Sequence, residues 1–116
     1  MGKASYGDMT GPNGLLANRA PFQGNSLSAE WTTFRPAAGR LDDLEFSILA
    51  EDWYRACAAN KRMYVVYSYS TPIAWALDGE CAYCAEQKFS VTTSKGQTYV
   101  RAWINYYYTT KAACHG

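Results

Sequence analysis

Four cysteines and one histidine are the residues of this 116-residue chain that could hold a metal ion. Cys81 and Cys84 form a C-x-x-C pair, the spacing that begins many zinc sites, but a structural zinc ion needs four ligands. The other candidates are Cys57, Cys114 and His115, and the last two are adjacent, which is not a standard zinc-knuckle spacing. In a β-strand, Cys81 and Cys84 would point to opposite faces. We therefore expect no metal and no cofactor, with a zinc-stabilised module as an alternative.

Catalytic residues are scarce in the chain. His115 is the single histidine and lies one residue from the end of the sequence, where chains fray, so a nucleophile would lack a fixed general base. Thioredoxin-like redox chemistry needs its C-x-x-C at a helix N-terminus, whereas this pair is predicted on a hairpin strand. Glu80 and Glu86 could form a carboxylate pair, but two solvated surface acids are the commoner outcome. We expect that the protein is not an enzyme.

Tyrosine is the most unusual feature of the composition, with ten Tyr against four Trp and four Phe. Tyr, Ser and Thr are concentrated in residues 64–71 and 90–94. One interpretation is a half-exposed antiparallel sheet whose outer face carries Tyr and Ser. The other is a recognition surface, because Tyr, Trp and Arg are enriched in interface hot spots. The candidate binding residues are Tyr64, Tyr69, Thr92, Thr93, Lys95 and Arg101.

The charge balance restricts the class of partner. Eleven Lys and Arg against ten Asp and Glu give a formal net charge of +1, and no basic run is present. Nucleic acid, stacked on sheet aromatics, is therefore possible but not favoured. A protein partner of unknown identity is the main expectation. The sequence shows neither an export signal nor an apolar run long enough to cross a membrane, so we expect a cytoplasmic protein with reduced thiols and no membrane partner.

One long helix is predicted over residues 42–60, with Asp42 or Asp43 as its N-cap. Helical spacing predicts that its buried stripe contains Phe46, Ile48, Leu49, Trp53, Ala56 and Cys57. A second helix is predicted over residues 95–106, because residues 94–97 fit a capping box. A strand remains the alternative there, since the segment is rich in Tyr and Trp.

Period-two alternation and β-branched or aromatic residues predict strands over residues 27–31, 63–69, 73–77, 80–85 and 89–93. The segment 27–31 is expected at the edge of the sheet. Residues 35–40 contain Pro36 and Gly39 and are predicted to form a loop. Asp78-Gly79 predicts a two-residue hairpin turn between its flanking strands.

These elements predict an α+β fold, in which a small antiparallel β-meander of three to four strands packs against one or two helices. We expect a flexible N-terminal arm over residues 1–21, a single domain over 22–110 and a short tail over 111–116. The expected core comprises Leu44, Ile48, Trp53, Val65, Tyr67, Ile73, Trp75, Phe89, Val91, Val100, Trp103 and Ile104.

Two segments, YVVYSYSTPIAW from Tyr64 and KFSVTTSKGQ from Lys88, resemble a family of small actinobacteriophage proteins grouped as a domain of unknown function. Its members commonly carry YSYGTPIA-like and YSVTTSKHQ-like segments. This chain has Ser70 where Gly is common and Gly96 where His is common. The resemblance implies a phage origin and a host-cytoplasm setting, and it implies no activity. We therefore expect an accessory phage protein that binds a macromolecule and could inhibit a host factor or a defence system. The alternative is a small nucleic-acid-binding or regulatory protein.

Overall fold

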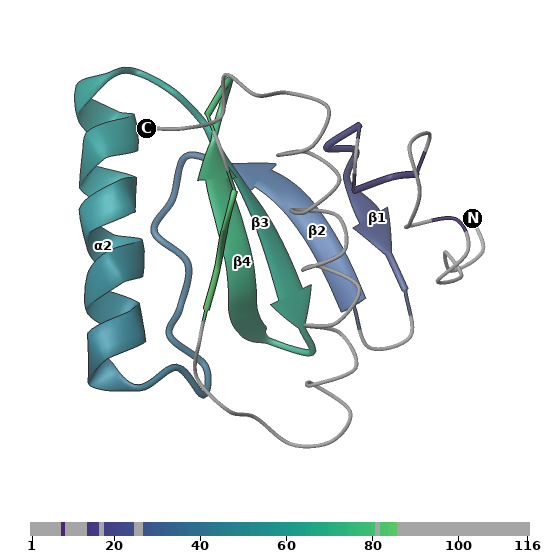
Figure 1. Cartoon of the computed structure of the whole chain (residues 1–116), viewed down its shortest axis with the longest axis horizontal. Helices are drawn as coiled ribbons and strands as arrows, with labels where there is room; N and C mark the ends of the chain where they lie inside the picture. The colour runs from purple at the N-terminus through teal and green to yellow at the C-terminus, as the bar shows by residue number, and fades with distance from the viewer. Residues whose placement is uncertain (1–7, 9–13, 17, 25–26, 81, 86–116) are drawn as a thin grey trace.

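A computed structural model describes residues 8, 14–16, 18–24, 27–80 and 82–85 of the chain. Its elements are β1 (Phe22–Gln23), β2 (Leu27–Thr32), α2 (Asp43–Ala58), β3 (Met63–Ser68), β4 (Thr71–Leu77) and β5 (Tyr83–Cys84). The strands form a five-stranded antiparallel sheet in the order β1-β2-β3-β4-β5, so that each strand pairs with its neighbour in sequence. α2 runs along one side of this sheet (Figure 1). The fold is α+β, which confirms the predicted antiparallel meander packed on a helix, with five strands where three to four were expected.

α2 begins at the predicted place because Asp42 caps it. The Asp42 carboxylate accepts a hydrogen bond from the backbone N–H of Glu45 at 2.8 Å, and so satisfies one of the amides that the first turn leaves without a partner. At the other end, the Lys61 N–H donates to the Ala56 carbonyl at 2.8 Å and Asn60 adopts a φ of 56°. This is a Schellman motif, and it explains why the helix stops before Asn60.

The buried stripe of α2 is narrower than the sequence predicted. Leu49 and Ala56 are buried against the sheet, and three half-buried residues flank them: Phe46, Ile48 and Trp53. The prediction was wrong for Cys57, which is exposed, and for Leu44, which is 72% exposed. Leu44 lies five positions before Leu49, which places it about 140° around the helix from the buried line.

Side chains alternate between the two faces of the sheet along each strand, and each face has a buried cluster. Met63, Val65 and Trp75 lie on the face toward α2, in one cluster with Leu49 and Ala56. The opposite face has a second cluster, which contains Leu16, Leu27, Ala29, Tyr64, Val66, Ala74 and Ala76. β2 contributes to this cluster from inside the sheet, because β1 pairs with its outer side. The prediction that residues 27–31 form the edge strand was therefore wrong.

Part of the segment before β1 belongs to the folded domain. Leu16 is fully buried, and the guanidinium of the buried Arg19 donates to the backbone carbonyl of Leu77 at 3.0 Å. Both residues lie within the predicted arm over 1–21, and both are buried in the structure. The predicted strand 89–93, the predicted helix 95–106, the predicted tail and the expected core residues from Phe89 onward lie outside the described residues.

The Asp78-Gly79 turn forms but does not make a tight hairpin. The Glu80 N–H donates to the Leu77 carbonyl at 2.9 Å, and Gly79 has a φ of 80° whereas Asp78 does not have a positive φ. Two-residue hairpin turns that match the twist of the strands need a positive φ at the first central residue, which Asp78 does not have. The register pairs Trp75 of β4 with Tyr83 of β5, which leaves more than two residues between the paired strands, so the predicted two-residue hairpin was wrong. Within the described segments, no helix has the length and apolarity needed to span a membrane.

Candidate functional site

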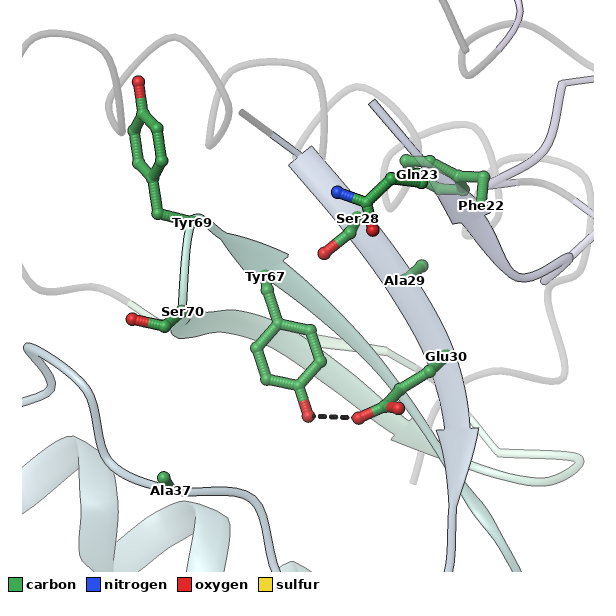
Figure 2. Close-up of a pocket in the computed structure, with 9 residues that line it drawn as sticks. All are labelled: Phe22, Gln23, Ser28, Ala29, Glu30, Ala37, Tyr67, Tyr69 and Ser70. Atoms are coloured by element: carbon green, nitrogen blue, oxygen red, sulfur yellow. Dashed lines mark hydrogen bonds between the residues drawn. The ribbon is translucent and has the colours of Figure 1, made fainter. Parts of the chain in front are cut away.

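A groove of about 400 Å³, lined by both polar and apolar side chains, lies over β1, β2 and β3, beside the loop that leads to α2. Its described lining residues are Phe22, Gln23, Ser28, Ala29, Glu30, Ala37, Tyr67, Tyr69 and Ser70 (Figure 2). Ligand pockets usually occupy about 300–1,000 Å³, so this groove has room for a small ligand or for one side chain of a partner.

The alternation of β2 places its polar residues in the groove. Leu27 and Ala29 are buried on the face away from α2, so Ser28 and Glu30 point to the other face. The antiparallel register pairs Ser28 with Tyr67 of β3. The register of the β3–β4 pairing shifts between Val66 and Tyr67, as it does at a β-bulge. Bulges often occur beside functional sites, where they redirect a side chain.

Tyr67 and Glu30 form the polar centre of the groove. The Tyr67 hydroxyl donates to Oε2 of Glu30 at 2.7 Å, and the two side chains point toward one another (Figure 2). Burial raises the pKa of Tyr67, and the hydrogen bond to the Glu30 carboxylate raises it further. Tyr67 therefore keeps its proton at neutral pH and acts as the donor. The pair orients an exposed carboxylate in the groove.

Tyr69 stands at the rim of the groove and is 64% exposed. It is the first residue of the two-residue turn between β3 and β4, because Ser68 pairs with Thr71. Its φ is 54°, in the left-handed region that glycine favours and that other residues adopt at a cost. Figure 2 shows its ring directed away from the Tyr67–Glu30 pair. The turn thus presents a large aromatic side chain to solvent.

The structure describes two of the candidate binding residues, Tyr64 and Tyr69, and only one of them is exposed. Tyr69 is exposed, as the predicted surface requires. Tyr64 is fully buried, and its hydroxyl donates to the Ala20 carbonyl at 2.7 Å, so its assignment to a binding surface was wrong. Tyr64 lies within β3, whereas Tyr69 lies in the turn that follows this strand. The other candidates lie outside the described residues: Thr92, Thr93, Lys95 and Arg101.

The described part of the chain holds no group of three or more His, Cys, Asp and Glu that could bind a metal. Cys57 is exposed on α2 and Cys84 is half-buried on β5. Cys81, Cys114 and His115 lie outside the described residues, so the expectation that no metal is needed stays a prediction.

Sequence reasoning missed Glu30 and Tyr67 as site residues. In the predicted strand 27–31, period-two alternation marks Glu30 only as a polar position, and Tyr67 is among the expected core residues. A signal was available, since the same alternation places Ser28 and Glu30 together on one face. The partner across the strand depends on the register, which the sequence alone did not determine.

A second exposed surface lies along α2 and the loop before it. The Arg35 guanidinium carbon lies 5.7 Å from the Phe46 ring centroid and 5.8 Å from that of Trp53, and the Trp53 indole N–H donates to the Thr33 carbonyl at 3.1 Å. Tyr54, which packs beside Trp53, is 62% exposed. These contacts hold the loop against the helix.

The model of a family of unknown function, DUF8033, matches residues 16–115. The chain belongs to DUF8033. The DUF8033 match begins at Leu16, the buried residue that lies ahead of β1, and it includes all the described groove residues. Comparison with curated proteins and with solved structures finds no match.

Proposed function

We propose that this chain is a small accessory protein of phage type that acts without catalysis, by binding a protein partner through Tyr69 and the adjoining groove. The observation that carries the proposal is Tyr69, an aromatic residue that is 64% exposed and has a φ of 54°. A non-glycine residue in this conformation costs about 1–2 kcal/mol. Glycine would fit the turn without that cost, so a role for the ring explains why tyrosine is present.

Tyrosine is well suited to this role. Its ring provides a large contact area, its hydroxyl adds a hydrogen bond, and only two torsion angles are ordered on binding. Tyr is among the residues enriched in hot spots of protein interfaces. The groove next to Tyr69 supplies hydrogen-bonding groups from Gln23, Ser28 and Glu30, which suits the polar edge of such an interface.

The groove favours a protein over a nucleic acid. Glu30 is the charged member of its described lining, and a carboxylate repels a phosphate backbone. The phage setting rests on the resemblance of the Tyr64 and Lys88 segments to actinobacteriophage proteins. In that setting, the partner is a host factor or a component of host defence, which the protein inhibits by occupying its surface.

Affinity capture from an actinobacterial host lysate tests the proposal, with the tagged wild-type chain compared with Tyr69→Ala and Tyr54→Ala. Tyr54 is the matched control because it is the same residue type, equally exposed, and outside the groove. We expect one host protein to be retained by the wild type and by Tyr54→Ala, and to be lost from Tyr69→Ala. Equal recovery with all three chains would contradict the proposal.

A further inference from the structure

The Glu30 carboxylate in the groove has no cationic partner in the part of the chain that the structure describes. Its one hydrogen bond there is the one to Tyr67, which engages Oε2. The described ion pairs are elsewhere: Arg55 with Asp52 and Glu80, and Lys61 with Glu80. Glu30 therefore gives the groove a negative charge that the described lining does not neutralise.

The groups around Glu30 add acceptors and an aromatic wall. Gln23 and Ser28 lie opposite each other on β1 and β2 and reach the groove with an amide and a hydroxyl (Figure 2). The Gln23 amide nitrogen donates to the Gly24 carbonyl at 3.4 Å, which leaves its oxygen as the group offered to a ligand. The Tyr67 ring is held in place by its hydrogen bond to Glu30. A ligand that matches these groups is cationic, planar and rich in N–H donors.

We propose that the groove binds the guanidinium of an arginine side chain, contributed by the protein partner. Arginine presents five donors in a planar fork, pairs with carboxylates and stacks on aromatic rings. In the groove, the guanidinium donates to Glu30 and Gln23 and lies against Tyr67, while its aliphatic stem passes Tyr69 at the rim. A lysine ammonium would satisfy the charge but would neither stack nor reach several acceptors at once. This inference rests on the proposed function, since it names the side chain that the partner supplies.

A titration of the isotopically labelled chain with N-acetyl-L-arginine amide, followed by NMR, tests the inference. The matched probe is N-acetyl-L-citrulline amide, which has nearly the same shape and no charge. We expect saturable shifts confined to the groove, around residues 23, 28, 30 and 67–70. A hydrogen bond to a charged group contributes more binding free energy than a neutral one. This difference should make the citrulline probe bind about tenfold more weakly than the arginine probe. Equal binding of both probes, or shifts elsewhere only, would overturn the inference.

Two variants localise the effect. Glu30→Gln removes the charge but still accepts the Tyr67 hydrogen bond. This variant should bind the arginine probe with an affinity about tenfold lower than that of the wild type. Glu51→Gln changes an exposed carboxylate on α2, outside the groove, and should leave the affinity unchanged. Thermal unfolding of both variants establishes that each is folded. An unchanged affinity in folded Glu30→Gln would refute the assignment of the guanidinium site.

The same variants separate this inference from the proposed function. If the host protein is lost from Tyr69→Ala but retained at full level by Glu30→Gln, Tyr69 binds the partner and the arginine inference is wrong. If Tyr69→Ala retains the host protein while the arginine probe binds the groove, the proposed function is wrong and the groove takes a guanidinium from another source. Loss of the host protein from both variants, together with arginine binding, supports both.

Discussion

The backbone of Tyr69 provides a stability test that needs no knowledge of the partner. Its φ of 54° places it in the left-handed region, where a residue with a Cβ atom is disfavoured by about 1–2 kcal/mol. Glycine removes that penalty but loses about 0.5–1 kcal/mol more backbone entropy on folding than alanine does. The difference between these two terms runs from about 0 to 1.5 kcal/mol, so we expect Tyr69→Gly to be more stable than the wild type by about 0.75 kcal/mol.

The matched variant is Tyr69→Ala, which removes the ring but keeps the Cβ atom. Because the side chain is 64% exposed, this change should alter the free energy of unfolding by about 0.5 kcal/mol or less. Because both variants lack the ring, the difference between their free energies of unfolding isolates the contribution of the backbone conformation at position 69. Urea unfolding followed by circular dichroism measures both free energies, and the midpoint of thermal unfolding should rise by about 2–4 °C in the glycine variant.

A glycine variant that is no more stable than the alanine variant would refute this reasoning, because it would mean that Tyr69 carries no backbone strain. A glycine variant that is more stable but no longer retains the partner would show that stability is exchanged for binding at this position. That second result is the one that the proposed function predicts.

Three further predictions concern groups that hold the fold together. Asp42→Ala removes the N-cap of α2 and should cost about 1 kcal/mol of stability in urea unfolding, whereas Asp42→Asn should retain most of it. Tyr64→Phe leaves a backbone carbonyl without its donor and should cost about 1 kcal/mol, with no loss of partner capture, because Tyr64 is buried. The hydrogen bond from Arg55, assisted by Lys61, holds the pKa of Glu80 below its ordinary value of 4.5. Its contribution is therefore fully present above pH 4.5 and is lost as the pH falls through the lowered pKa, so Glu80→Gln should flatten the pH dependence of stability in that window.

Local patterns predicted most of the described fold. Asp42 as N-cap, the end of α2 near Asn60, and the two central strands follow from capping chemistry and from the run of β-branched and aromatic residues after Met63. These features depend on neighbours within a few residues. The sequence did not predict β1, which is two residues long. It also did not predict that Leu16 is buried, because this residue lies in a segment rich in Gly and Pro.

The candidate site could be predicted only in part, because it depends on long-range pairing. Tyr64 begins the apolar run Tyr64-Val65-Val66, and such a run favours a buried position over the surface position that was predicted. The Glu30–Tyr67 hydrogen bond could not be predicted, because it requires the β2–β3 register and the bulge before Tyr67. The conformation of Tyr69 was equally hidden, since tyrosine has no preference for a positive φ.

Site-specific photo-crosslinking in actinobacterial host cells tests the central claim most directly. The photoreactive amino acid p-benzoylphenylalanine replaces Tyr69 in one chain and Tyr54 in another, two positions of nearly equal exposure. If the protein binds a partner through Tyr69 and the groove, light should join one discrete host protein to the chain labelled at Tyr69 and leave the chain labelled at Tyr54 without that product. Adding Glu30→Gln to the chain labelled at Tyr69 should reduce the yield. No light-dependent product at Tyr69, or the same product from both positions, would contradict the proposed function.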